Sequence, residues 1–349
     1  MTTAMMTENA SDGSRYRRHS HPLWRRGLLR TESVILLAII ALLVFGTIAV
    51  PFFAQPYTYQ TMFLNAAPVL LMVLPVTLVI VTGDIDLSVG SVLGFSSALF
   101  GLTYQAGVPL VTAAVIGVVA GGLVGAFNGF LVTTVGLPSL AVTIGTLALF
   151  RGIAVGLLGT SSVTSFPPEI SRFLNAPFLG PLPVVAVAFI VLAIAFGVLL
   201  HLTPFGRGVF AIGLSPENAA FSGVAVGRTR FILFVLSGLV AGATGVYFTL
   251  QYNNAIGTNG NGFELQVVTA IVLGGVSIWG GRGTVIGAVA GGLLIAALNK
   301  TLQLAGIGSD TISIVTGAAL ILSVVVASIA GFISRRRRSK VSALAAVAA

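Results

Sequence analysis

Charge is the scarcest property of this chain, because only 8% of its 349 residues are Asp, Glu, Lys or Arg. A soluble domain carries about 25% charged residues. So few charges cannot make a water-facing surface, and lipid must therefore cover most of the protein. The chain also has no cysteine and only three histidines. The lack of cysteine excludes disulfides and catalytic thiols, and no metal site or cofactor is expected.

Long apolar runs and glycine take the place of charge: 56% of the residues are hydrophobic and 43 are Gly. Each run is long enough to cross a bilayer as a helix, and small residues let neighbouring membrane helices approach closely. We therefore predict an all-α integral membrane protein with about ten transmembrane helices. The predicted spans are 33–53, 61–82, 88–106, 109–133, 138–159, 181–200, 230–252, 264–281, 284–304 and 310–333.

The formal net charge of +9 is concentrated outside the apolar runs. Arginines gather in residues 1–32, before the first run, and in residues 334–349, after the last. Basic clusters beside membrane spans mark the cytoplasmic side, so this pattern indicates membrane orientation rather than nucleic-acid binding. Residues 1–32 are predicted to be a disordered basic tail, residues 33–333 the transmembrane domain, and residues 334–349 a basic and then alanine-rich tail.

The same rule predicts which connections lie inside the cell. Both basic termini should be cytoplasmic, which requires an even number of spans. Residues 201–230 form the only long interior segment rich in positive charge, and six spans before it and four after it place it in the cytoplasm as well. Residues 160–180 and 253–263 are then predicted to lie on the outer side.

Two acids stand between the second and third predicted spans, in the segment GDIDLSVG at 83–90. An ionised carboxylate at the bilayer centre costs about 2.5–3.5 kcal/mol, so the chain must break here and bring the acids to water or to protein partners. Ser88 can cap the helix that follows. The segment is either a gating hinge that lines a pathway or an ordinary loop at the membrane surface. The candidate residues are Asp84, Asp86, Ser88 and Gly90.

The segment LSPENAAFSG at 214–223 contains the signals of a short cytoplasmic helix. A serine suits the N-cap, a proline the first helical position, a glutamate the positive helix end and a glycine the position after the helix. A helix of about two turns is marginal alone in water, so it must dock either on a partner or on its own protein. The residues assigned to it are Ser215, Pro216, Glu217, Ala219, Ala220 and Gly223.

A third segment, GGVSIWGGRGTVIG at 274–287, has too much glycine for a helix interior. We predict a tight cytoplasmic turn between two closely packed spans, with Arg282 at the surface. Gly281, Arg282 and Gly283 are candidates for a gating role. A phosphate-binding loop is excluded because GxxxxGK[ST] occurs nowhere, so the chain has no nucleotide-hydrolysing site of its own.

Isolated polar residues also lie inside or beside the predicted spans. They are Asn65, Asn128, Gln251, Asn299 and Asp310. Such residues face either another helix or a cavity, where they could bond solute hydroxyls; Asn128 is a further pathway candidate. Arg151, within the fifth span, is expected to snorkel to an interface. No nucleophile, base and orienting group can be assembled, so no catalytic residues are assigned and an enzyme is not predicted.

Four segments in order resemble the permease subunits of ribose-type ABC importers, which carry monosaccharides and furanosyl autoinducers. They are GDIDLSVGSVLG at 83–94, GAFNGFLVTTVGLPSLAVTIGTLALFRG at 125–152, TPFGRGVFAIGLSPENAAFSGV at 203–224 and GGVSIWGGRGTVIGAVAGG at 274–292. The resemblance covers residues 33–333. It departs from the family at Asp84, where many relatives have Gly, and at Asn218, where the EAA-type loop of ABC importers has Ala.

The resemblance implies an ABC importer permease fold that moves a monosaccharide or related small polar sugar or polyol across the bacterial inner (cytoplasmic) membrane by alternating access. The implied partners are a cytoplasmic ABC ATPase, a periplasmic sugar-binding protein and a second permease copy, in a homodimer or a heterodimer. The helix at 215–223 would contact the ATPase, which hydrolyses the ATP. Because the binding protein supplies specificity, a polar and weakly selective lining is expected.

Three other interpretations remain open. A branched-chain amino-acid ABC permease has a related architecture, although GDIDLSVG and GGRGTV favour sugar. An ion-coupled secondary transporter would use Asp84 and Asp86 to bind H⁺ or Na⁺ and would need no ATPase. A non-transporting membrane scaffold is disfavoured by the acids and the glycine-rich breaks.

Overall fold

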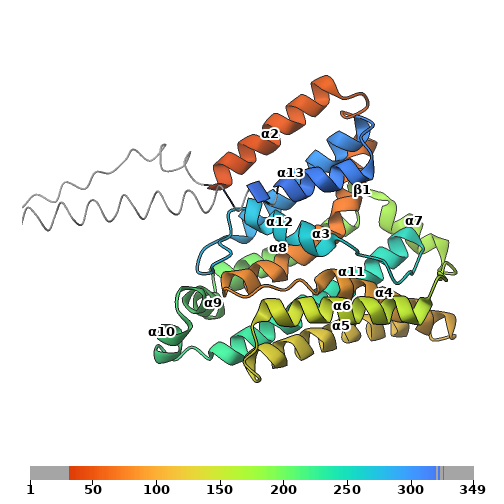
Figure 1. Cartoon of the computed structure of the whole chain (residues 1–349). Coiled ribbons are helices and arrows are strands. Elements are labelled where there is room, and N and C mark those ends of the chain that lie inside the picture. Colours follow the sequence, from red (N-terminus) through yellow and green to blue (C-terminus); the bar gives the residue numbers. More distant parts are fainter. Residues whose placement is uncertain (1–30, 320, 323–324, 326–349) are drawn as a thin grey trace, which may run out of the picture.

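The computed structural model describes residues 31–319, 321–322 and 325, and most of them are helical (Figure 1). The elements are α2 (Thr31–Ala49), α3 (Pro56–Val81), α4 (Val89–Gln105), α5 (Leu110–Thr133), α6 (Ser139–Leu158), α7 (Pro168–Asn175), β1 (Pro177–Leu179), β2 (Leu182–Pro183), α8 (Val185–His201), α9 (Pro204–Leu214), α10 (Pro216–Phe221), α11 (Val226–Tyr252), α12 (Phe263–Leu273) and α13 (Val285–Leu304). The predicted tails lie outside the described residues, apart from positions 31 and 32, as do the last positions of the predicted span 310–333.

The architecture agrees with the predicted all-α class. In the described part of the chain, the only sheet is the small antiparallel pair β1–β2. Among the described residues, five helices are long and apolar enough to cross a membrane, and α8 with α9 adds a sixth if their 66° bend is one broken span. The predicted span 264–281 is wrong in its extent: α12 ends at Leu273, and the glycines from Gly274 onward form a turn with positive φ angles at several positions.

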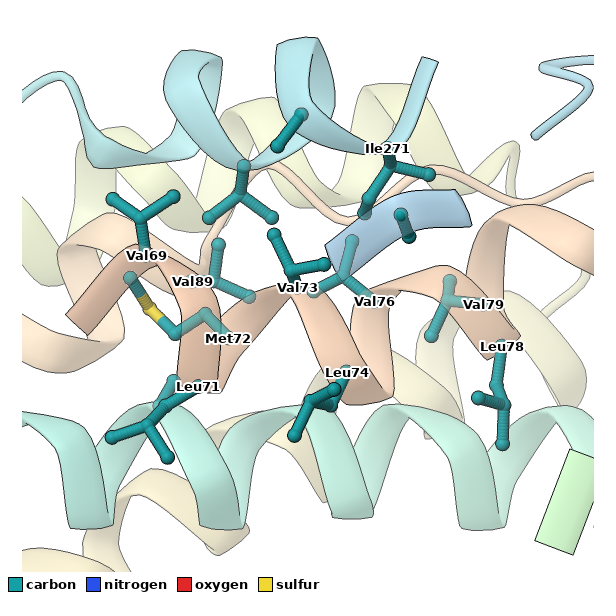
Figure 2. Packing of buried hydrophobic residues seen from close by; sticks show 14 of the residues in the cluster. Val69, Leu71, Met72, Val73, Leu74, Val76, Leu78, Val79, Val89 and Ile271 are labelled. Atoms are coloured by element: carbon teal, nitrogen blue, oxygen red, sulfur yellow. The ribbon is translucent and has the colours of Figure 1, made fainter. Parts of the chain in front are cut away.

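Helix α3 lies at the centre of the bundle. Every residue from 67 to 81 is buried. Figure 2 shows Leu71 and Leu74 directed to one side of the helix, and Val76 directed toward Ile271 of α12 on the other. A helix that is apolar on all faces needs neighbours on all faces, so α3 is the frame against which the other helices are positioned.

Helices α5 and α11 approach each other through glycines, as the glycine content predicts. A Cβ atom added at Gly121 of α5 would collide with the Gly238 carbonyl oxygen of α11, and one added at Gly238 would collide with Gly121 in turn. Close contact of this kind gives the van der Waals packing that drives helix association in lipid. This contact leaves α11 little freedom to shift against α5, so the polar side chains of α11 are held in defined positions.

The bundle has two distinct ends, and segments predicted to share a side of the membrane lie at the same end (Figure 1). At one end, near α9 and α10, the Gly281 amide donates to the Val81 carbonyl at 2.8 Å. At the opposite end, Val163 and Ala255 form an isolated antiparallel bridge that joins the two connections predicted to be outside. We call these the cytoplasmic end and the outer end, following the predicted orientation.

Residues 253–263 are predicted to form an outer loop, but in the structure residues 253–262 enter the bundle along α4. A Cβ at Gly101 of α4 would collide with Ala255, and a Cβ at Gly90 would collide with Gly260. The segment thus follows α4 for roughly three turns, in a groove that exists because these α4 positions are glycines. We call residues 253–262 the buried loop.

Arg151 of α6 holds the buried loop in place. Its Nη1 donates to the Asn259 carbonyl at 2.6 Å and to the Gly257 carbonyl at 3.3 Å. The Asn259 side chain donates from Nδ2 to Ser97 Oγ of α4 at 2.9 Å. Arg151 is predicted to snorkel to an interface; in the structure its guanidinium pairs with backbone carbonyls of the buried loop, which lipid could not satisfy.

Candidate functional site

Residues 82–88, which we call the acidic break, form a non-helical segment between α3 and α4, and both of its acids are buried. Its backbone is paired with α6: the Ile85 amide donates to Ser139 Oγ at 3.2 Å, and the Ile85 carbonyl accepts from Thr143 Oγ1 at 3.0 Å. Non-helical backbone within a membrane protein is tolerated where protein satisfies it. Both acids are buried and have partners within the protein, and the two interpretations of this segment, a gating hinge or a loop at the membrane surface, stay predictions.

Asp86 is only 1% exposed and accepts three hydrogen bonds. Its Oδ1 accepts from the Ser88 amide at 3.0 Å and from Ser88 Oγ at 2.6 Å, and its Oδ2 accepts from Ser237 Oγ of α11 at 2.7 Å. Asn128 of α5 donates from Nδ2 to Ser88 Oγ at 2.9 Å. Three predicted candidates, Asp86, Ser88 and Asn128, are thus brought together in one network that ties the break to α5 and α11.

The network changes the role predicted for Ser88 as a helix cap. Ser88 occupies the N-cap position of α4, but its hydroxyl donates to Asp86 and accepts nothing from the first helical turn. The carboxylate of Asp86 instead accepts the Ser88 amide, next to the helix end where partial positive charge favours an anion. Asp86, not Ser88, is therefore the residue that fixes the start of α4.

Asp84 has a different partner from Asp86. Its Oδ2 lies 2.9 Å from Nε of Arg230, in the first turns of α11, with 9% of the Asp84 side chain and 24% of the Arg230 side chain exposed. Thr82 Oγ1 also donates to Asp84 Oδ2, at 3.1 Å. The acidic break is thus linked by an ion pair to the cytoplasmic part of α11, only a few residues after α10.

Three sequence-distant segments meet at the cytoplasmic end. The Gly281 amide binds the Val81 carbonyl at the end of α3. Gly213 of α9 lies against both, because a Cβ there would collide with the Val81 carbonyl oxygen and the Gly281 amide. A Cβ at Gly280 would likewise meet the Gly83 amide. We call Val81, Gly83, Gly213, Gly280 and Gly281 the cytoplasmic junction. Two of the segments singled out in the sequence, 83–90 and 274–287, meet there with the residue that directly precedes the third, 214–223.

Helix α10 has the boundaries that its sequence predicts. Ser215 is the N-cap, and its hydroxyl accepts from the Asn218 amide at 3.3 Å. Pro216 is the first helical residue, and Glu217 lies in the first turn. After the helix, Gly223 has a φ of +83°, a left-handed conformation in which a side chain is strained. Local capping chemistry alone thus defines this element.

The surface of α10 is divided between an anchor and an exposed face. Ala219 is buried against the protein, whereas Glu217 and Ala220 are exposed. Phe221, at the last helical position, is 91% exposed, and Leu214 just before the helix is exposed too. Apolar side chains presented in this way on a short protruding helix are typical of a contact surface for another protein.

The remaining candidates do not join the Asp86 network. Gly90 packs against the buried loop, and Gly283 packs against Val276 within the glycine-rich turn. Arg282 is exposed, as predicted, and its carbonyl accepts from the Ser277 amide at 2.9 Å. These residues shape turns and close approaches rather than a polar centre.

Sequence reasoning missed Arg230, Ser237 and Gly213, which complete the contacts of the predicted residues. Arg230 and Ser237 are seven residues apart on α11 and therefore lie on one helix face. The only signal was this spacing of a cation and a hydroxyl along an otherwise apolar helix. Gly213 carried no signal beyond being one of many glycines.

Residues 58–325 match the family model described as branched-chain amino acid transport system / permease component. The chain belongs to this permease family. The permease is 37% identical over 261 residues to the autoinducer 2 import system permease protein LsrD of Escherichia coli (strain SMS-3-5 / SECEC). This alignment covers 73% of this chain and 79% of that relative. It is 38% identical over 265 residues to LsrD of Yersinia enterocolitica serotype O:8, covering 74% and 80%. No solved structure matches the chain significantly.

The predicted family is therefore confirmed, and the permease is a membrane component of an ABC import system of the bacterial inner membrane. It is the transport subunit and not itself an enzyme. The resemblance noted on four short segments extends to a family match that spans most of the chain.

Proposed function

We propose that the permease imports a small sugar-like solute by alternating access, driven by a separate ABC ATPase. A periplasmic binding protein delivers the solute, and a second permease copy completes the pathway. The observation that carries the proposal is α10, a capped cytoplasmic helix that exposes Phe221 and is joined through α11 to the buried acids of the break. A self-sufficient carrier has no need of such a surface.

The proposed topology has about ten spans with both termini in the cytoplasm. In the part of the chain that the structure describes, five or six helices meet the length and composition expected of a span. The others are the shorter apolar helix α2, the 17-residue α4, α12 together with the buried loop that precedes it, and the helical residues 309–319. An even number of spans keeps both basic tails and the segment 201–230 on the side that the positive-inside rule assigns to them.

A continuous set of contacts leads from the proposed ATPase surface to the centre of the bundle. Helix α10 is followed within a few residues by α11, where Arg230 pairs with Asp84. Two turns further along α11, Ser237 binds Asp86. Movement of α10 by an ATPase would therefore act on the acidic break through two direct contacts on one helix face.

The relatives favour a sugar-like solute over an amino acid. The curated relatives are named for import of autoinducer 2, at 37–38% identity over about three quarters of this chain. The description of the family model, in contrast, names branched-chain amino acids. Leucine is thus the second candidate solute, and the uptake experiment compares the two classes directly.

The function is tested by uptake into proteoliposomes that contain the permease, with or without its ATPase and binding protein. We expect ATP-dependent accumulation of a pentose or of autoinducer 2, and no accumulation of leucine. Uptake by the permease alone, driven by an ion gradient without ATP, would contradict the proposal and favour an ion-coupled carrier. Leucine uptake with no sugar uptake would instead favour a permease for branched-chain amino acids.

Replacing Gly223 with valine should uncouple ATP hydrolysis from transport. A β-branched residue at a φ of +83° is strained by about 1–2 kcal/mol, which is large for a helix of six residues. The end of α10 should then shift while the membrane helices stay folded. We expect uptake to fall about tenfold or more, whereas the ATPase of the reconstituted complex continues to hydrolyse ATP.

Gly227→Val provides a matched control for this change. Gly227 lies in the first turn of α11, is exposed like Gly223, has no positive φ and has open space around its Cβ position. The same side chain added there should leave coupled uptake near the unmodified rate. An equal loss of coupled uptake in the two variants would show that the added side-chain volume causes the effect, and not the strained backbone at position 223.

A further inference from the structure

A cleft of about 280 Å³ opens between α3, α12, α13 and the helical residues that follow α13. One part of its lining is polar and consists of Asn65, Gln266, Asn299, Lys300 and Gln303. The cleft belongs to the outer part of the bundle, because Asn65 is in the first half of α3 and the α13 residues are in its last two turns. None of these residues takes part in the Asp86 network or the cytoplasmic junction.

The side chains that α13 contributes to the cleft change from small to polar between the middle of the bundle and its outer end. Gly292, Ala296, Asn299 and Gln303 recur at helical spacing and line the same cleft. Small residues at the inner positions make room, and amides at the outer positions supply hydrogen-bonding groups. Val69, in the middle of α3, lies at the apolar inner part. The cleft thus runs from the outer end toward the middle of the bundle.

This lining is costly unless it meets water or a polar solute. A lysine within a membrane helix costs about 2.5–3.5 kcal/mol at the bilayer centre, and side-chain amides need partners for both donors and acceptors. Two amides are partly used: Asn65 Oδ1 accepts from Tyr252 Oη at 3.1 Å, and Asn299 Oδ1 accepts from Thr316 Oγ1 at 3.2 Å. In both cases the donating Nδ2 group is left for another ligand.

We propose that this cleft is a solute-binding subsite on the import route, suited to a small polyhydroxylated solute. Hydroxyl groups donate and accept, which matches a wall of amides, and small-molecule sites begin at a size of about 300 Å³. Lys300 sets the charge preference: the described residues of the cleft include one ammonium and no carboxylate, so the subsite takes neutral or anionic solutes and rejects cations. The proposal rests on the proposed import function and names where the solute binds.

The absence of cysteine from the natural chain allows a direct test. A single cysteine at Ala296, which lines the cleft, replaces a small side chain with another small one. Ile190→Cys is the matched control, since Ile190 is exposed on the outer half of the apolar helix α8, about as far from the outer helix end as the cleft residues, and does not line the cleft. We expect this position to face lipid. Spheroplasts carrying the whole importer would be treated with membrane-impermeant charged methanethiosulfonates.

The expected result has three parts. Ala296→Cys reacts at least about tenfold faster than Ile190→Cys, because a charged reagent is excluded from hydrocarbon. The anionic sulfonatoethyl reagent reacts about three- to fivefold faster than the cationic trimethylammonium one, and Lys300→Gln removes this preference. D-ribose, D-xylose or glycerol slows the labelling, whereas choline at the same concentration does not.

The proposal is overturned if Ala296→Cys is as unreactive as the control, if none of the three polyols protects it, or if choline protects it as well as they do. Labelling requires no ATP hydrolysis, so it is separate from the test of the importer function. An unreactive cleft in an importer that still takes up sugar would remove the subsite and leave the function. ATP-independent uptake with a reactive cleft that the polyols protect would remove the proposed ATP-driven function and leave the subsite.

Discussion

Replacing Asp86 with alanine should lower the free energy of unfolding of the permease by about 2–4 kcal/mol, because each buried donor left unpaired costs about 1–3 kcal/mol. The donors are the Ser88 amide, Ser88 Oγ and Ser237 Oγ. Thermal unfolding of the purified permease in detergent measures the loss. We expect a clear drop in melting temperature, together with loss of transport, since the start of α4 is no longer fixed.

Asp86→Asn separates the hydrogen-bonding role of this residue from its charge. An asparagine Oδ1 can accept both bonds from Ser88, and its Nδ2 can donate to Ser237 Oγ. We therefore expect Asp86→Asn to melt close to the unmodified permease and to retain ATP-driven uptake. A stable Asp86→Asn variant without transport would show that the carboxylate charge is needed, as an ion-coupled carrier requires.

The parts of the fold that depend on local chemistry could be predicted from the sequence. Helix α10 is the best example, because Ser215, Pro216 and Gly223 each act on the backbone within a few residues of themselves. The break at the two acids was predictable for the same reason: charge and glycine cannot continue an apolar helix. The positions of these elements in the chain could thus be predicted, whereas their contacts with other helices could not.

The parts that depend on distant partners could not be predicted. Ser237 and Arg230 lie about 150 residues after the acids they bind, and nothing near the acids indicates which helix supplies the partner. The buried loop was predicted as an outer connection because the positive-inside rule and the count of spans place residues 253–263 on that side. Its entry into the bundle depends on the glycine groove of α4, and that fit becomes visible only when both segments are folded.

The ion pair between Asp84 and Arg230 should give the second large effect. Arg230→Met leaves Asp84 as an unpaired charge with 9% of its side chain exposed. Breaking a fully buried pair in this way costs about 3–5 kcal/mol, and the cost here is smaller because Arg230 is partly exposed. Asp84→Asn should cost less than Arg230→Met, since the arginine that remains can reach water. Melting temperatures of the two variants check this order.

The double variant Asp84→Asn, Arg230→Met distinguishes a link that transmits movement from one that only stabilises the fold. Removing both charges removes the unpaired acid, so the melting temperature should recover toward that of the unmodified permease, as a double-mutant cycle measures. Coupled transport should not recover, because the direct contact between α11 and the acidic break is still missing, while ATP hydrolysis by the complex continues. Transport that recovers together with stability would show that the pair is structural only, and that the movement of α10 reaches the break through Ser237 and the cytoplasmic junction alone.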